Sequence, residues 1–165
     1  MSLMLPNDRI VISALESEFS NLHSRYCALV CSIPEGDIYR NPGRPAGPPV
    51  YSAGEILLRG AALVEQTCGG ITANLWDDPF EWTLPETLST SAKIIEYLEE
   101  VEATRRRAFS SFNQDQDLLK EIMAPTAETR VLIDLLTETL VKSAEYYGRA
   151  MATRSLLLAD ASAGE

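Results

Sequence analysis

The last third of the chain carries its longest amphipathic pattern. The run from Thr126 to Leu158 contains no proline. It holds roughly 30 residues, enough for a helix of about 45 Å at ~1.5 Å per residue. Apolar residues recur along it at helical spacing: Leu132, Leu135, Leu136, Leu140, Ala144, Tyr147, Met151 and Leu158. Because such a stripe must be buried against other helices, we predict a long packed helix that opens at Pro125 and Thr126.

The N-terminal part shows the same periodicity. Asn7 or Asp8 can cap a helix after Pro6, and this helix should end before Pro34, since a proline disfavours helix at the preceding residue. Its apolar positions are Val11, Leu15, Phe19, Leu22, Tyr26, Leu29 and Ile33. Residues 34–50, with five prolines and three glycines, should form a long loop that wraps the helices or shapes a pocket mouth. So long a first connection suggests that the first two helices are not simple antiparallel neighbours.

Two capping boxes predict the remaining helices. Ser52-Ala53-Gly54-Glu55 opens a second helix, with Gly69-Gly70 as its expected stop. Thr83-Leu84-Pro85-Glu86 opens a third helix that continues to Phe112. Between them, Trp76 and Trp82 are expected to anchor a loop over residues 71–82. A short helical turn is expected near residues 118–123.

Four long amphipathic helices with almost no strand signal predict an all-α, four-helix bundle. We expect one domain over residues 7–158, with residues 1–6 and 159–165 as flexible ends. The 165 residues are 45% hydrophobic, which is a globular composition.

Charge and patterning exclude several classes of partner. The net charge is −10, which argues against nucleic acid and against an anionic membrane surface. The longest uncharged runs, such as Tyr26 to Pro34, are far shorter than the ~18 residues of a membrane span. The first six residues lack the features of a signal peptide, so a cytoplasmic protein is expected. The three cysteines are expected to be free thiols.

Two short motifs resemble those of the DinB-like family of bacterial four-helix bundles. The second predicted helix reads Ser-Ala-Gly-Glu-Ile-Leu-Leu-Arg-Gly from Ser52 to Gly60, similar to the family's cap followed by Leu-Leu-x-His. The last reads Lys-Ser-Ala-Glu-Tyr-Tyr-Gly-Arg from Lys142 to Arg149, similar to His-x-x-x-His-Arg-Gly-Gln. The resemblance covers about residues 7–158 and implies the bundle fold and, as for many members, a homodimer.

The resemblance also implies where a metal would be expected. Family members commonly hold a divalent metal with three histidines, whose positions here are Gly60, Lys142 and Tyr146. Glycine has no donor atom, an ammonium group repels a cation, and a phenol binds metals poorly unless ionised. We therefore expect a degenerate member without metal or other cofactor, and a packing role for the matched Gly148, where a missing side chain permits close approach.

The residues around that position give two functional hypotheses. Glu55, Arg59, Lys142, Tyr146 and Arg149 would form either a pocket for a small anionic ligand or a self-satisfied polar network. In the network, Lys142 or Arg59 would pair with Glu55 or Glu145. The alternative is a thiol-dependent transferase or isomerase of the mycothiol or bacillithiol type. It would have relocated metal ligands, or use Tyr146 or Lys142 for acid–base chemistry.

The only histidine, His23, lies at helical spacing with Cys27 and Cys31. Three readings stay open: a soft-metal site such as zinc, a nucleophilic Cys27–His23 pair, or structural cysteines that behave as small hydrophobes. A di-iron site is excluded because it needs two Glu-x-x-His motifs.

A charged run lies in the third predicted helix. It contains Glu96, Glu99, Glu100 and Glu102, followed by Arg105, Arg106 and Arg107. We interpret the run as a solvated helix face, with Glu102 and Arg106 as an i,i+4 pair.

Overall fold

The computed structural model describes residues 8–43, 51–78, 83–124, 126 and 128–163. Within these residues the chain forms four long helices, and the predicted all-α class is confirmed. The helices are α1 (Ile10–Ser32), α2 (Ala53–Ala73), α3 (Ser91–Ser110) and α4 (Leu132–Ala163). The shorter elements are the 3₁₀ turns η1 (Glu35–Asp37) and η3 (Asp115–Leu119) and the antiparallel strands β1 (Glu121–Met123) and β2 (Thr129–Val131).

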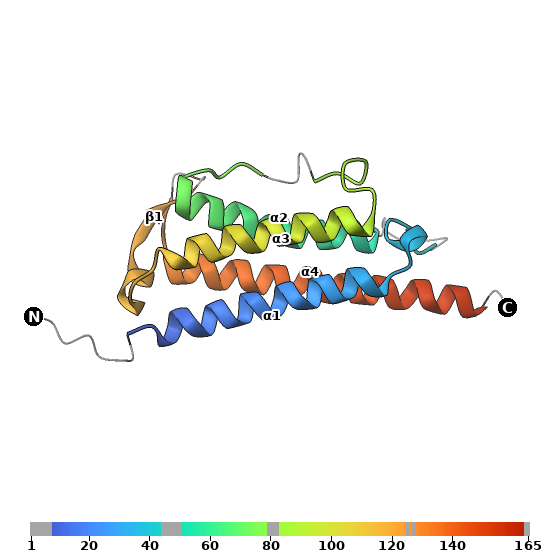
Figure 1. Cartoon of the computed structure of the whole chain (residues 1–165), viewed down its shortest axis with the longest axis horizontal. Coiled ribbons are helices and arrows are strands. Elements are labelled where there is room, and N and C mark those ends of the chain that lie inside the picture. Colours follow the sequence, from blue (N-terminus) through green and yellow to red (C-terminus); the bar gives the residue numbers. More distant parts are fainter. Residues whose placement is uncertain (1–7, 44–50, 79–82, 125, 127, 164–165) are drawn as a thin grey trace, which may run out of the picture.

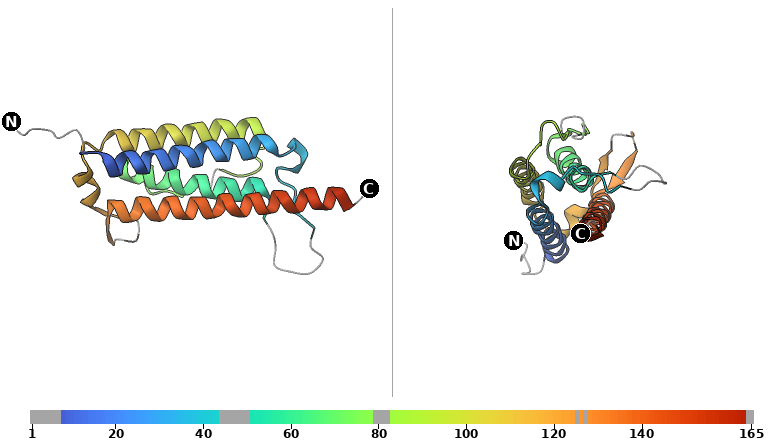
Figure 2. Two further views of the ribbon diagram at one scale, coloured as in Figure 1. Left: turned by 90° about the horizontal axis from the view of Figure 1, so that it is seen from below. Right: turned by 90° about the vertical axis from the view of Figure 1, so that its right-hand side faces the viewer.

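The four helices lie side by side, with α1 and α4 running in one direction and α2 and α3 in the other (Figures 1 and 2). Helix α2 packs most extensively against α4 and also against α3, whereas α1 packs mainly against α3 and only sparsely against α4. Helices α1 and α2 therefore lie across the diagonal, as the long first connection suggested. Because α2 and α3 are parallel neighbours, the end of α2 at Ala73 and the start of α3 at Ser91 lie at opposite ends of the bundle (Figure 1).

The N-terminus of α1 is capped by a residue distant in sequence. The expected cap at Asp8 is wrong, because α1 begins after Arg9, which makes no side-chain cap. Instead the Asp115 carboxylate accepts hydrogen bonds from the amides of Val11 (3.0 Å) and Ile12 (2.9 Å). Although partial desolvation raises the pKa of Asp115, these backbone hydrogen bonds lower it overall.

The start of α2 was predicted correctly and its end was not. Ser52 and Glu55 form the complete capping box. However, α2 continues through Gly69-Gly70 to Ala73 and ends at Asn74, which adopts the left-handed conformation with φ 53°. Gly70 has a packing role instead: a Cβ there would lie 2.2 Å from the ring of Trp76, so only glycine lets this tryptophan anchor the following loop.

The start of α3 was also predicted too early. Residues Leu84–Leu88 make only one isolated turn, and α3 begins at Ser91 with the Thr90 hydroxyl accepting from the amide of Lys93 at 3.2 Å. The carboxylate of Glu35 in η1 accepts a second hydrogen bond, from the amide of Ser91 at 3.0 Å. The first connection thus helps to cap the third helix.

Helix α4 begins later and ends later than expected. Residues 129–131 pair with β1, so the helix starts at Leu132, and it continues through the predicted tail to Ala163. The predicted turn near residues 118–123 is a 3₁₀ turn at Asp115–Leu119 followed by β1. The predicted features at Asn7, residues 44–50, Trp82, Pro125 and residues 164–165 lie outside the described residues.

The buried face of α4 differs from the predicted stripe. Ala144, Met151 and Leu158 are exposed, whereas the buried positions are Leu132, Leu136, Thr139, Ser143, Ala150, Thr153 and Leu157. This face contains small and hydroxyl-bearing residues because it lies closely against α2, where Thr67 and Thr139 share a hydrogen bond of 2.8 Å. The predicted stripe is therefore right at Leu132 and Leu136 and wrong toward the C-terminal half of the helix, where it departs from the buried face.

Part of the charged run of α3 is buried, contrary to the predicted solvated face. The side chains of Glu102 and Arg105 are each only 3% exposed and form a bidentate pair with distances of 2.6 and 3.0 Å. Arg106 adds the expected i,i+4 contact at 3.0 Å. Burial acts to raise the pKa of Glu102, but the hydrogen bonds and charge of Arg105 outweigh it and lower the pKa overall.

We expect Arg105→Leu to destabilise the fold by about 3–5 kcal/mol, because it leaves the Glu102 carboxylate buried without its main partner. The double variant Glu102→Leu/Arg105→Leu should regain much of that loss. Arg106→Leu is the matched control. It removes a cation whose side chain is 68% exposed, and it should cost about 1 kcal/mol or less. Urea unfolding of the three variants measures the differences, and equal costs for Arg105→Leu and Arg106→Leu would contradict the assignment.

The same pair predicts a pH dependence. The pKa of Glu102 is lower in the folded state than in the unfolded chain. The stability that the ionised Glu102 carboxylate contributes is therefore present above pH ~4.3, the ordinary pKa of glutamate, and is lost as the pH falls through the folded pKa. The destabilisation caused by Arg105→Leu should therefore shrink below that pH. Urea unfolding at a series of pH values measures this, and a pH-independent difference would show that Glu102 is not the group involved.

Candidate functional site

The position where the family's metal was expected lies between α2 and α4, and it is filled by protein. Gly60 on α2 faces Tyr146 on α4: a Cβ added to Gly60 would lie 2.9 Å from the Cβ of Tyr146 and 1.9 Å from the hydroxyl oxygen of Tyr26. Two of the three aligned positions are thus brought together. The absent side chain at Gly60 is what admits the Tyr26 ring from α1.

Buried hydrogen bonds connect three helices at this point. The Tyr26 hydroxyl donates to the carbonyl of Ser143 at 2.7 Å, and the Ser143 hydroxyl donates to the carbonyl of Gly60 at 3.0 Å. Burial raises the pKa of Tyr26 well above its ordinary value, so its hydroxyl stays neutral. The arrangement is a packed, neutral polar contact with no room for a three-histidine metal site. Sequence reasoning assigned Tyr26 only to the apolar stripe and gave Ser143 no role.

Gly60→Ala should destabilise the fold by about 1–3 kcal/mol or more, because the new methyl group overlaps the Tyr26 hydroxyl. Gly148→Ala is the matched control in the same kind of element. Contrary to the packing role expected for Gly148, no atom of the described residues outside the helix's own backbone lies within 4 Å of a Cβ there, so the change should stabilise the helix by about 0.5–1 kcal/mol. Thermal and urea unfolding measure both, and similar effects of the two changes would contradict this packing.

A groove runs along the outer side of the α2–α4 contact. One hollow of about 120 Å³ is lined by Arg59, Ala62, Leu63, Gln66, Asp78 and Tyr146. A second hollow of about 320 Å³ is lined by Leu63, Lys142, Glu145, Tyr146 and Arg149. Because Leu63 and Tyr146 line both, we treat the two hollows together and call them the α2–α4 groove. The groove contains four of the five predicted pocket residues.

The fifth predicted pocket residue lies elsewhere. The carboxylate of Glu55 accepts hydrogen bonds from the amide (3.0 Å) and hydroxyl (2.7 Å) of Ser52, so it serves as the cap of α2. It does not pair with Lys142. The predicted network that crosslinks α2 and α4 through Glu55 is therefore not formed.

The cations of the groove differ in how they are held. Lys142 pairs with Glu138, which also binds Arg130 at 2.5 Å, and hydrogen bonds from these two cations lower the pKa of Glu138 to about 2. Among the described residues Arg149 makes no ion pair, and its guanidinium carbon lies 5.3 Å from the ring centroid of Tyr146. Arg149 is thus available to an incoming anion, whereas Lys142 has to share or leave Glu138.

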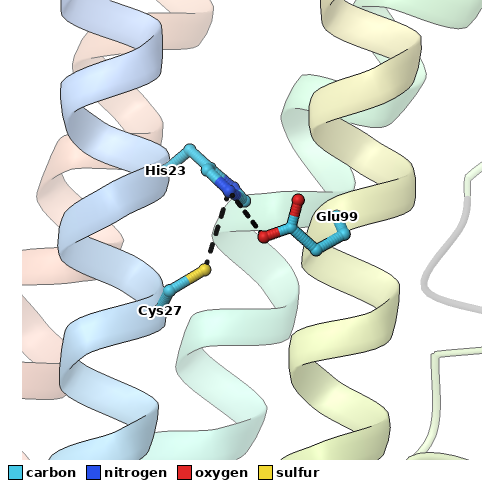
Figure 3. A group of neighbouring side chains, drawn as sticks. All are labelled: His23, Cys27 and Glu99. Atoms are coloured by element: carbon cyan, nitrogen blue, oxygen red, sulfur yellow. Dashed lines mark hydrogen bonds and ion pairs between the residues drawn. The ribbon is translucent and has the colours of Figure 1, made fainter.

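A second cluster lies between α1 and α3 (Figure 3). His23 and Cys27 project from α1 toward Glu99 on α3. The Nε2 atom of His23 lies 3.3 Å from Oε1 of Glu99 and 3.7 Å from Sγ of Cys27. Cys31 is exposed and is not part of the cluster. The sequence therefore indicated two of these residues and missed Glu99, which belongs to the charged run of α3.

The predicted nucleophilic Cys27–His23 pair is not supported. Burial, and after it the nearby Glu99 carboxylate, raise the pKa of Cys27 to about 11, so the thiol is protonated at neutral pH. Cys68 is buried, and its pKa is raised to about 12 mainly by that burial. Neither thiol has the lowered pKa of an activated nucleophile.

No protein-family model, curated protein or solved structure matches the chain. Among the described helices, none combines the length and the apolar character that crossing a membrane requires. A family assignment therefore depends on the two sequence motifs and on the arrangement of the helices.

Proposed function

We propose that this chain is a DinB-like four-helix bundle without a metal at the α2–α4 position, and that it binds a small anionic ligand in the α2–α4 groove. The observation that supports the metal-free part of the proposal is the contact between Gly60, Tyr26 and Tyr146, where packed side chains occupy the position that the resemblance assigns to a metal. The helix order also supports it, because α2 and α4 are the two helices that supply the family's ligands and they are close neighbours here.

The groove's chemistry favours an anion that carries an apolar or aromatic part. Arg59, Lys142 and Arg149 supply cationic donors, and Gln66 adds an amide. Charge-assisted hydrogen bonds from guanidinium groups are the usual means of holding carboxylates and phosphates. Leu63 and the Tyr146 ring supply the apolar wall. The acidic groups of Asp78 and Glu145 lie in the same groove and would exclude ligands of high negative charge.

Benzoate and inorganic phosphate are suitable probes for calorimetry on the full chain. We expect benzoate to bind more tightly than phosphate, and we expect Arg149→Gln to weaken it by about tenfold, equivalent to about 1.4 kcal/mol. Arg40→Gln is the matched control. Arg40 is exposed, pairs with Asp37 and lies outside the groove, so its loss should leave binding unchanged. Absence of binding by either probe, or equal losses in both variants, would contradict the anion site.

The proposal includes a homodimer, as the family resemblance implies. Two exposed apolar side chains of α4, seven residues apart and therefore on nearly the same face, support it: Met151 is 43% exposed and Leu158 is 49% exposed. A second copy covering this edge of α4 would bury them. Light scattering should give twice the 18.2 kDa chain mass, and Met151→Glu should shift the protein toward the monomer. A monomeric parent protein would contradict the dimer without affecting the groove.

A further inference from the structure

The cluster of His23, Cys27 and Glu99 joins two helices through one nitrogen, one sulfur and one oxygen atom (Figure 3). His23 and Cys27 are one turn apart on α1, so their side chains share a face. Glu99 lies 76 positions after His23 in sequence, on the facing side of α3. The three potential ligand atoms all lie within 4.8 Å of one another.

We propose that His23 Nε2, Cys27 Sγ and a carboxylate oxygen of Glu99 bind a zinc ion between α1 and α3, with a fourth position open to water. This site is separate from the α2–α4 groove and does not depend on the function proposed for it. Imidazole, thiolate and carboxylate are the three ligand types that zinc takes in proteins, and three protein ligands plus water is a common zinc arrangement.

The spacing of the atoms fits a tetrahedral ion. Two ligands at ~2.0–2.3 Å from zinc, separated by the tetrahedral angle, are about 3.3–3.6 Å apart. The observed distances from His23 Nε2, 3.3 Å to Glu99 and 3.7 Å to Cys27, are close to this range. The remaining edge, from Cys27 to Glu99, is at most 4.8 Å and has to shorten toward the same range. Glu99 can move to do so because its side chain is 62% exposed and, among the described residues, is held only by His23.

Charge at the site is also suited to a dication. On binding, the Cys27 thiol forms the sulfur–zinc bond and releases its proton to solvent, so the thiolate and the Glu99 carboxylate together neutralise the two positive charges. Glu102 lies one turn further along α3 but is already engaged by Arg105 and Arg106. It therefore does not compete as a ligand, and the two arginines balance its charge.

The geometry separates Cys27 from the other thiols. Cys31 is exposed and outside the cluster, and Cys68 is buried on α2. Because serine is close to cysteine in size, Cys27→Ser removes the sulfur ligand at little steric cost, and the same substitution at Cys31 is a matched control. Glu99→Gln keeps the shape of the third ligand while removing its charge.

The test uses the full chain stripped of metal, with zinc titrated against a chelating dye and cobalt as a spectroscopic probe. We expect one zinc per chain and a thiolate-to-cobalt absorption band. Cys27→Ser should abolish the band. It should also weaken zinc binding by more than the loss of a supporting residue does, which is about 10–100-fold. Glu99→Gln should weaken binding without removing the band, and Cys31→Ser should change neither.

A cobalt complex without a thiolate band overturns the site, as does zinc binding that survives Cys27→Ser or is lost in Cys31→Ser. Thermal unfolding of each metal-free variant shows whether the fold is retained, and His23→Gln provides a second ligand change if Cys27→Ser fails to fold. Arg149→Gln should leave zinc binding unchanged, and Cys27→Ser should leave benzoate binding unchanged. The two proposals can therefore fail separately.

Discussion

The close contact of α2 with α4 depends on the absence of a side chain at Gly60. The Tyr26 hydroxyl occupies the space that a Cβ there would need, and it reaches the Ser143 carbonyl across the interior. Because Ser143 in turn donates to the carbonyl of Gly60, one tyrosine links α1, α4 and α2. A buried hydroxyl with satisfied partners specifies one packing of the helices, since any shift would leave a polar group unpaired. Side chains fill the space between Gly60 and Tyr146, and the two candidate sites lie at the margins of the bundle.

Those margins differ in chemistry because different helices form them. The outer side of α2 and α4 presents arginine and lysine beside an apolar wall, which suits a small organic anion. The side formed by α1 and α3 presents imidazole, thiol and carboxylate, which suits a soft or borderline cation. The whole chain has a net charge of −10, so the cationic groove is a local exception. The carboxylate of Glu99 on the α1–α3 side has the same sign as the chain.

Several helix ends are set by residues from elsewhere in the chain. Asp115 of η3 caps α1 and Glu35 of η1 caps α3, so each connection also stabilises a helix that it does not adjoin in sequence. A carboxylate at a helix N-terminus satisfies free amides and interacts favourably with the helix dipole. Local cap rules therefore succeeded at Ser52, where the partner is three residues away, and failed at Asp8 and at Thr83.

The sequence by itself determined the all-α class, the four amphipathic segments and the capping box of α2. These follow from periodicity and short-range spacing, which a single segment contains. The grouping of Arg59 with Lys142, Tyr146 and Arg149 was instead implied by the family resemblance, because these residues lie on two different helices. Tertiary structure decided the rest: which side of α4 is buried, the pairing of Glu102 with Arg105 in the interior, the role of Tyr26 against Gly60, and the arrival of Glu99 beside His23 and Cys27. Each depends on helices meeting across large sequence separations, and no local pattern encodes which faces will meet.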